Sequence, residues 1–460
     1  MSQILEVKNL TVRYPQAETT VFPAVDINFS AGEFILVAGP SGGGKSTFLH
    51  ALNGLIPQMT PAELTGGIYH EGTDLTGQTV SQRSRVLGTV MQNPSEQIIF
   101  ESVFDELAFP LENIAVPPAS IHARIEELLQ TIDLRPEASP TVLSGGEKQK
   151  LVAAGTLIMG QKLLLFDEVL ANLDESSAYE LLDYLQLLCR EQGYTVIFVE
   201  HRLDWVLQYA DRVLWIAGDE LREFSDLAAF QRFWQDQIHD ALAFEWPILP
   251  VSPTAEVLIE ARGASFTAGG RTILQPTDFT LRRGERCVLI GANGSGKTSF
   301  LNVLAGLTKP TQGSVYTPYA KKDRYQSIGV IMQDPNYQLF MSTVQEEIDF
   351  RSTSPERTRQ LMEALELEGL EERHPQSLSE GQKRKVGVAA ILAMDPEILL
   401  FDEPTVGLDY RSLGLLLREL KRMDERSPLT MLTITHDNRA AHYLGDQVIR
   451  MDAGQLTQVR

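Results

Sequence analysis

The chain has 460 residues, enough for two or three domains at roughly 100–200 residues each. Its composition, 43% hydrophobic and 22% charged, is typical of soluble globular proteins. No apolar run approaches the ~18 residues of a membrane-spanning helix, and the first ten residues do not resemble a signal peptide. The net charge of −21 disfavours broad nucleic-acid binding, which needs lysine and arginine to neutralise phosphates. Cys189 and Cys287 form neither a disulfide framework nor a zinc motif, so we expect a reduced, cytoplasmic setting.

The first elements in chain order predict a phosphate-binding loop. An apolar strand, FILVAG (34–39), leads into GPSGGGKST (39–47), and an apolar-patterned helix, FLHALNGL (48–55), follows. The glycine-rich segment matches G-x-x-x-x-G-K-[S/T], in which backbone N–H groups wrap a phosphate chain at a helix N-terminus. We therefore expect Lys45 to reach the β- and γ-phosphates and Ser46 to hold Mg²⁺.

Alternating helices and strands come next. Helical patterns cover IHARIEELLQTI (121–132) and SAYELLDYLQLLCREQG (177–193), and the second ends on a glycine C-cap signal. The runs LLLF (163–166) and TVIFVE (195–200) are wholly apolar, as expected for strands of a sheet covered on both faces. The order of elements predicts an α/β domain.

The same order of elements recurs after a proline-rich segment, EWPILPVSPT (245–254), which reads as a linker. Lys45 and Lys297 lie 252 positions apart, and Asp167 and Asp402 lie 235 apart. A repeat this long indicates tandem domains rather than a solenoid. We expect domain 1 at residues 1–244, a linker at 245–256 and domain 2 at 257–460.

Each half places an acidic pair after an apolar strand, downstream of its glycine-rich loop. Asp167 and Asp402 stand at strand ends, where a carboxylate can meet the Mg²⁺ shell. The adjacent Glu168 and Glu403 are placed to polarise an attacking water. Phosphoryl transfer depends mainly on positioning and charge neutralisation, and these residues supply both.

The segments LSGGEKQK (143–150) and LSEGQKRK (378–385) lie between the loop and the acidic pair in each half. LSGGE is the signature of ABC ATPases, and the chain closely resembles two fused ABC nucleotide-binding domains over nearly its whole length. The resemblance implies two tandem P-loop NTPase domains, each with a mainly parallel-sheet core, a helical subdomain and an antiparallel β part. It also matches further family motifs, namely the Q-loop glutamines Gln92 and Gln333, the D-loop aspartates Asp174 and Asp409, the switch histidines His201 and His436, and the adenine-stacking aromatics Tyr14 and Phe266.

The resemblance implies ATP hydrolysis with Mg²⁺ at two sites. Expected catalytic residues are Glu168, Glu403, His201, His436, Gln92 and Gln333. Expected metal ligands are Ser46, Gln92, Asp167, Thr298, Gln333 and Asp402. Expected ATP contacts are Tyr14, Gly39, Ser41, Gly42, Gly43, Gly44, Lys45, Ser46, Thr47, Phe266, Gly291, Asn293, Gly294, Ser295, Gly296, Lys297, Thr298, Ser299, Ser144, Gly145, Gly146, Ser379, Glu380 and Gly381. The family also implies head-to-tail pairing within the chain, so that LSEGQ closes the Lys45 site and LSGGE closes the Lys297 site.

The second signature carries Glu380 where the first has Gly145. Both signatures also fit a capping box, Ser-x-x-Glu/Gln, at the start of a helix. Glu380 is then either a helix-start residue, which the helix dipole favours by about 0.3–1 kcal/mol, or a carboxylate that repels the γ-phosphate and slows the first site. Val169 also departs from the family, which usually has proline there.

The segments 92–109 and 333–350 bear on the work that hydrolysis drives. They resemble the Q-loop region of energy-coupling factor (ECF) importer ATPases, which take up vitamins, vitamin precursors or transition-metal ions. That resemblance implies a peripheral protein on the cytoplasmic face of the membrane, an integral-membrane coupling subunit and a separate membrane substrate-binding subunit as partners, and no nucleic acid. We expect a groove for a partner helix, lined by Ile98, Phe100, Leu339 and Phe340; internal packing is the alternative for these side chains.

Other work for a tandem ATPase remains open. A fused sugar-importer ATPase would have the same domain order. A soluble tandem ABC protein acting on ribosomes would carry a long, basic linker, and residues 221–250 are not basic. A DNA-repair ABC protein would need zinc cysteines or coiled-coil insertions. The complete catalytic sets disfavour a nucleotide sensor without enzymatic activity.

Overall fold

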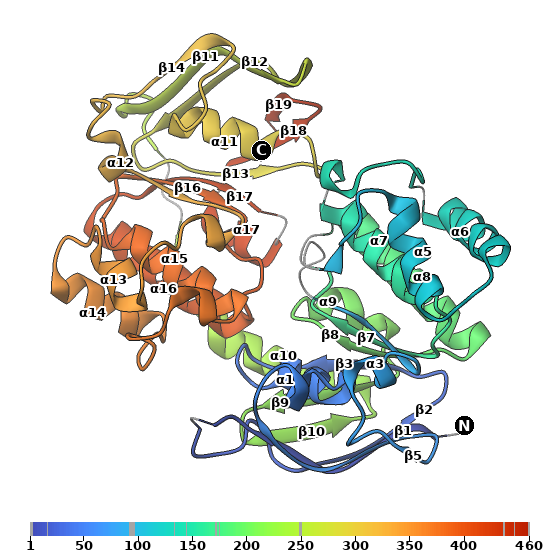
Figure 1. The fold of residues 1–460 in the computed structure, drawn as a ribbon. Coiled ribbons are helices and arrows are strands. Elements are labelled where there is room, and N and C mark those ends of the chain that lie inside the picture. The colour runs from blue at the N-terminus through green and yellow to red at the C-terminus, as the bar shows by residue number, and fades with distance from the viewer. Residues whose placement is uncertain are drawn as a thin grey trace. The chain divides into compact units, whose positions relative to one another are not determined.

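The computed structural model describes residues 3–15, 17–91, 97–132, 134–143, 145–170, 173, 175–247, 251–435, 438–445 and 447–458 (Figure 1). The chain forms two compact units, Met1–Asp236 and Gln237–Arg460. Each unit combines a mainly parallel sheet, an antiparallel sheet and a group of helices, so the predicted α/β fold class is confirmed. None of the described helices is both long and apolar enough to cross a bilayer.

The parallel sheet of the first unit has the strand order β10-β9-β3-β8-β7-β6. Only β10 runs antiparallel to its neighbour. The strands are β3 (Phe34–Ala38), β6 (Leu87–Val90), β7 (Leu163–Asp167), β8 (Thr195–Val199), β9 (Arg212–Ala217) and β10 (Glu220–Phe224). The predicted strands at 34–39, 163–166 and 195–200 are therefore present.

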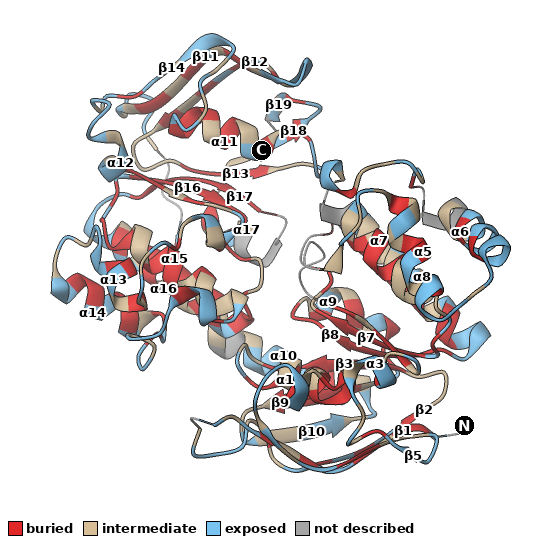
Figure 2. Cartoon of the chain, in the orientation of Figure 1, coloured by how far each residue is buried: buried red, intermediate tan, exposed pale blue. Residues whose placement is uncertain are grey.

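The central strands of this sheet are buried on both faces (Figure 2). Alternate side chains enter two different cores, because successive residues of a strand point to opposite faces. Phe166 and Phe198 pack with Leu182 of helix α8 (Glu175–Gln192). Leu165 and Ile197 pack with residues of helix α1 (Lys45–Asn53) and of the antiparallel sheet. This two-sided burial explains why the strand sequences are apolar throughout.

The antiparallel sheet has the order β2-β1-β4-β5. Its strands are β1 (Gln3–Arg13), β2 (Val25–Ser30), β4 (Glu63–His70) and β5 (Thr73–Asp74). The other described α-helices of the first unit are α2 (Leu55–Gln58), α3 (Val80–Arg83), α5 (Val103–Asn113), α6 (Pro118–Ile132), α7 (Gly145–Leu157) and α9 (Leu203–Val206). Helix α10 (Leu227–Leu242) begins in the first unit and ends in the second. Helices α5, α6 and α7 share a core of their own, which forms the helical subdomain.

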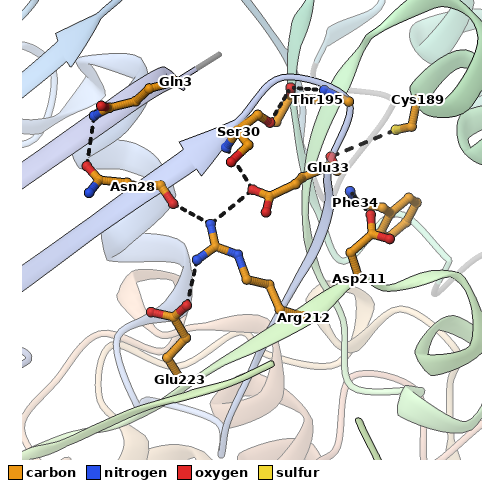
Figure 3. Close-up of polar contacts among 11 residues, drawn as sticks. Gln3, Asn28, Ser30, Glu33, Phe34, Cys189, Thr195, Asp211, Arg212 and Glu223 are labelled. Atoms are coloured by element: carbon orange, nitrogen blue, oxygen red, sulfur yellow. Dashed lines mark hydrogen bonds and ion pairs between the residues drawn. The ribbon is translucent and has the colours of Figure 1, made fainter. Parts of the chain in front are cut away.

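Arg212 ties the two sheets of the first unit together (Figure 3). Its guanidinium lies 2.6 Å from Glu223 Oε1 on β10 and 3.0 Å from Glu33 Oε2, and it also donates to the carbonyl of Asn28 on β2. Glu33 in turn accepts the N–H of Ser30 at 2.7 Å. The network fixes the turn between β2 and β3, and β3 leads directly into the glycine-rich loop.

The second unit repeats this architecture with the sheet order β15-β16-β17-β13-β18-β19 and an antiparallel sheet β12-β11-β14. Its strands are β11 (Val257–Ala268), β12 (Arg271–Arg282), β13 (Arg286–Ile290), β14 (Gln312–Tyr316), β15 (Ile328–Ile331), β16 (Ile398–Asp402), β17 (Thr430–Ile434), β18 (Gln447–Asp452) and β19 (Gln455–Gln458). Its helices are α11 (Lys297–Ala305), α12 (Arg324–Ser327), α13 (Val344–Asp349), α14 (Pro355–Ala364), α15 (Glu380–Leu392), α16 (Tyr410–Arg426) and α17 (Asn438–Leu444).

The segment around Trp246 packs into the second unit. Trp246 belongs to the core of that unit and is 7% exposed. Its Nε1 donates to Asp424 Oδ2 at 2.8 Å, and the Arg286 guanidinium lies 4.2 Å from its ring centroid. At least this part of the predicted linker, 245–256, is therefore an ordered piece of the second unit.

Candidate nucleotide sites

The two glycine-rich loops have the same conformation. Gly39 and Gly291 have φ values of 150° and 152°, and the glycines that precede α1 and α11 both have φ of 104°. A Cβ on Gly39 would lie 1.9 Å from the Ile216 carbonyl oxygen, and one on Gly291 would lie 2.2 Å from that of Met451. Only glycine therefore fits at these positions, as expected for a loop whose N–H groups face a phosphate.

The lysines predicted to bind phosphate close their own loops. Lys45 Nζ donates to the carbonyls of Gly39 at 3.0 Å and Pro40 at 2.9 Å. Lys297 Nζ donates to those of Gly291 at 2.7 Å and Ala292 at 2.9 Å. Each ammonium group is thus held inside its own glycine-rich loop. The backbone of that loop would surround a phosphate chain.

In each unit the hydroxyl and the aspartate predicted to bind magnesium lie together. Ser46 Oγ lies 3.2 Å from Asp167 Oδ1, and the Thr298 hydroxyl donates to Asp402. Burial, reinforced by the charge of Glu168, raises the pKa of Asp167 to about 7, although Ser46 and Lys45 act in the opposite direction. Burial also raises the pKa of Asp402. Buried carboxylate and hydroxyl oxygens form the hard donor set that Mg²⁺ prefers, so these residues fit the ion.

The predicted catalytic glutamates share an unusual backbone conformation. Glu168 has φ of 50° and Glu403 has φ of 51°, in the left-handed region that non-glycine residues rarely adopt. Their N–H groups donate to Val199 and Ile434 on the neighbouring strands, both at 2.9 Å. Strained backbone of this kind persists only where its surroundings fix it, and it gathers at functional sites.

In the first unit the glutamate meets the predicted switch histidine. His201 Nε2 lies 2.9 Å from Glu168 Oε1, and the two side chains are 8% and 13% exposed. The contact fixes the direction of the Glu168 carboxylate. The corresponding His436, together with Gln92, Asp174 and Ser144, falls outside the described residues. Gln333 is described and its side chain is exposed.

The predicted adenine contacts, Tyr14 and Phe266, are associated with the corresponding antiparallel strands β1 and β11. Tyr14 follows β1, and its hydroxyl lies 3.1 Å from the hydroxyl of Thr47 in α1. Phe266 lies in β11 and packs against the core that contains α11 residues. Their role in stacking on adenine stays a prediction.

The second signature forms the predicted capping box. Ser379 Oγ accepts the N–H of Gln382 at 3.3 Å, and Gln382 Oε1 accepts that of Ser379 at 3.1 Å. Glu380 Oε1 lies 2.9 Å from Lys383 Nζ, which also donates to Asn336 Oδ1 at 3.0 Å. Glu380 therefore starts helix α15 with its charge countered by a lysine one turn later.

Sequence reasoning missed the residues that shape the segments after the Q-loop glutamines. Gln97 accepts the N–H of Met91 at 2.7 Å, and Gln338 accepts that of Met332 at 2.8 Å. The repeated Gln-x-Pro-x-x-Gln spacing was the available signal, because its second glutamine closes the loop in each half.

The outward side chains of these segments also differ from expectation. Glu106 accepts the N–H groups of Ile99 and Phe100, and Glu347 accepts those of Phe340 and Met341. Leu339 is buried in the core, whereas Phe340 is 76% exposed. Ile98 packs inward and Ile99, which follows it, is 64% exposed. Ile98 and Leu339 are therefore packing residues, and Ile99 and Phe340 are the exposed pair.

Glu200 is a second residue whose role the sequence did not indicate. Its buried carboxylate accepts the N–H groups of His201 at 2.9 Å, Arg202 at 3.1 Å and Leu170 at 3.3 Å. It thereby ties the segment after Glu168 to the segment that carries His201. Burial raises the pKa of Glu200, while Arg202 acts to lower it.

The fold and the duplicated loop, strand and helix arrangement define a P-loop ATPase built twice in one chain. Comparison with known proteins gives the family: the profile described as "ABC transporter" matches residues 22–171 and 274–406, more than half of the chain. The chain belongs to the ABC transporter family of ATP-binding proteins, and it is an ATPase.

Relatives match along almost the whole chain. A protein of Methanosarcina mazei provisionally named an ABC transporter ATP-binding protein is 30% identical over 521 residues, covering 98% of this chain and 88% of its own length. One from Treponema denticola, with the same provisional name, is 30% identical and covers 99% and 96%. A Bacillus subtilis protein provisionally named the HMP/thiamine import ATP-binding protein YkoD is 29% identical and covers 97% and 89%.

Solved structures show the same fold. The archaeal ribosome recycling factor aABCE1, solved with the ribosomal stalk protein aP1, is 21% identical to this chain. The match has a TM-score of 0.66 and covers 98% of this chain and 89% of that one. At this identity the likeness concerns the fold alone.

Proposed function

We propose that the chain is the tandem ATPase of an ECF-type importer, bound at the cytoplasmic face of the membrane and energising uptake of a vitamin, a vitamin precursor or a transition-metal ion. Two composite ATP sites form head-to-tail within the chain. The observation that carries the proposal is the matched pair of exposed apolar side chains, Ile99 and Phe340, on residues whose backbone N–H donates to a glutamate in each half. The import name of the Bacillus subtilis relative supports it.

Each site's chemistry follows from its residues. The loop N–H groups and Lys45 or Lys297 would bind the β- and γ-phosphates. Mg²⁺ would take a hydroxyl and a carboxylate oxygen in each unit, from Ser46 and Asp167 or from Thr298 and Asp402. Bound Mg²⁺ would neutralise charge that develops on the phosphates. Glu168 and Glu403 would orient and polarise the attacking water, and His201 would hold the first of them in place.

The first unit has a groove next to the segment that carries Ile99: its lining includes Gln97, two residues before Ile99, and Glu106, which accepts the N–H of Ile99. The groove has a volume of about 290 Å³ and opens between the end of β6 and helices α5 and α7. Its lining includes Leu55, Met91, Gln97, Pro110, Leu151 and Met159. An apolar groove rimmed by a few polar groups suits one face of an amphipathic helix, and we assign it to a cytoplasmic helix of the membrane coupling subunit.

Site-specific photo-crosslinking in native membranes tests the proposal. A photoreactive phenylalanine analogue replaces Ile99 or Phe340, with Met59 and Tyr316, also exposed, as control positions. We expect both test positions to capture one multi-spanning membrane protein, which a separate substrate-binding membrane protein accompanies. Capture of ribosomal proteins at the test positions would overturn the importer proposal. Capture of the membrane subunits of a sugar importer would support a role in transport but would replace the ECF type with another class of importer.

A further inference from the structure

Arg384 connects the signature helix of the second unit to the catalytic segment of the same unit. It lies in α15, five residues after Ser379, and is 6% exposed. Its Nη1 donates to the carbonyl oxygens of Met332 and Glu403, both at 3.3 Å. Met332 immediately precedes the Q-loop residue Gln333. One buried guanidinium therefore bridges two loops that carry predicted catalytic side chains.

The contact with Glu403 restrains a strained residue. Its left-handed backbone, at φ 51°, is strained and persists only where its surroundings fix it. The N–H of Glu403 is held by Ile434, and its C=O is held by Arg384. With both backbone polar groups of Glu403 fixed, the direction of its carboxylate is set by side-chain rotation alone.

Further charges support this position of Arg384. Burial lowers the pKa of its guanidinium, and Glu380, Asp334, Glu403 and Asp402 oppose that effect. Arginine stays protonated in proteins, so the group is a permanent cation among these carboxylates. Lys383, the preceding residue, adds a second link to the Q-loop segment through Asn336.

The first unit has glutamine at the equivalent position. Gln149 lies in α7, five residues after Ser144, and is 1% exposed. Neither polar atom of its amide has a hydrogen-bond partner among the residues that the structure describes. The bridge from signature helix to catalytic glutamate is therefore built in the second unit by Arg384, and Gln149 does not reproduce it within the described residues.

We propose that Arg384 is a positioning residue for the second ATP site, holding the backbone of Glu403 and of the Q-loop segment against the signature helix, and that Gln149 does not serve the first site in this way. The inference rests on the proposed role of Glu403 as the residue that polarises water. Because α15 begins within the signature, the bridge also carries any movement of that signature to Glu403.

The test is steady-state Mg-ATP hydrolysis by the full chain, with kcat and KM measured separately. Arg384→Met, Arg384→Lys and Gln149→Met are each made in chains that carry Glu168→Gln or Glu403→Gln, so that one glutamate remains. In the Glu168→Gln chain we expect Arg384→Met to lower kcat about 10-fold, with KM for ATP changed less than about 2-fold, because the defect lies in positioning. Arg384→Lys, which can still donate to one carbonyl, should recover part of the loss.

The Glu403→Gln chain provides the contrast. There Arg384→Met should have a much smaller effect on kcat, and Gln149→Met should leave kcat within about 2-fold, since the Gln149 amide has no hydrogen-bond partner to lose among the described residues. Equal losses from Arg384→Met in both chains, or no loss in the Glu168→Gln chain, would overturn the inference while leaving the ATPase assignment intact. Undiminished hydrolysis in both glutamine chains would overturn the role of Glu403 itself, and the inference with it.

If neither single-glutamate chain hydrolyses ATP, Arg384→Met and Gln149→Met are compared in the chain that keeps both glutamates, and this comparison tests the inference. The inference then requires that Arg384→Met lowers kcat about 2-fold or more and that Gln149→Met does not. Equal kcat in the two methionine variants would overturn the inference. The thermal midpoint of each variant identifies any that fail to fold.

Discussion

His201 Nε2 and Glu168 Oε1 lie 2.9 Å apart, and both side chains are largely buried. The contact joins a residue from the end of β7 to one from the end of β8, adjacent parallel strands whose carboxyl ends meet at the same edge of the sheet. A glutamate that is placed by a histidine in this way has a fixed direction for its carboxylate, which is what a residue that polarises water requires.

If Glu168 and Glu403 polarise the attacking water, removing both carboxylates should slow ATP hydrolysis. Replacing both Glu168 and Glu403 by glutamine should lower kcat for ATP hydrolysis by about 100-fold or more, because general-base assistance typically contributes 10²- to 10⁴-fold. ATP affinity, measured with a fluorescent nucleotide, should change little, since the loops and lysines remain. Hydrolysis within a few-fold of the wild-type rate would contradict the assignment of these residues.

His201→Ala tests the same contact from the other side. We expect kcat to fall because Glu168 loses the partner that orients it, while the phosphate-binding residues stay in place. In a chain that also carries Glu168→Gln, His201→Ala should add little further loss, since the two residues act together. Independent, multiplicative losses in kcat would show that His201 acts through something other than Glu168.

Glu200→Ala should destabilise the first unit. The substitution leaves the N–H groups of Leu170, His201 and Arg202 without their acceptor, and we expect a loss of about 3 kcal/mol in the free energy of unfolding, measured in urea. Thr435→Val, at the equivalent place in the second unit, is the control and should cost about 1 kcal/mol, since only one hydroxyl is removed. Similar losses for the two variants would refute the bracing role of Glu200.

Arg212→Gln should also weaken the first unit. Arg212 is 13% exposed at its side chain, and its loss leaves Glu33, which is 18% exposed, without this cation. Breaking a buried pair in this way costs about 3 kcal/mol in the free energy of unfolding. Arg262→Gln removes an exposed pair with Glu260 and should leave the urea midpoint nearly unchanged. The comparison is made by urea denaturation, and equal effects would count against the network of Figure 3.

Cys189 should be unreactive in the folded protein. Burial, aided by Asp211, raises the pKa of its thiol to about 12, and only the thiolate reacts. At pH 8.5 in a Cys287→Ala chain, iodoacetamide should modify Cys189 only as fast as the unit opens, so the rate should rise steeply with urea. Because the folded pKa lies above the unfolded value, this thiol favours the folded state fully below about pH 8.5, and its contribution is lost as pH rises toward 12. Rapid modification without denaturant would show that the thiol is accessible.

Several features followed from the sequence alone because their geometry is local. A strand, a glycine-rich turn and a helix are consecutive, so the positions of Lys45 and Lys297 within their loops could be predicted. The capping box of Ser379 and Gln382 spans three residues, and the structure confirms it. The duplication was evident from motif spacing, and both units have the same sheet order.

Other features depended on contacts between segments far apart in the chain. In the irregular segments after the Q-loop glutamines no periodicity gives the direction of a side chain, so only the backbone contacts made by Glu106 and Glu347 decide that Leu339 turns inward and Phe340 outward. Trp246 is buried because it packs into the core of the second unit, where Asp424 accepts its indole N–H, although its sequence surroundings indicate a linker. The sequence by itself determined the catalytic class, since the loop and strand motifs are local; the tertiary structure decided which side chains brace the sites and which face a partner, because those depend on neighbours that only folding brings together.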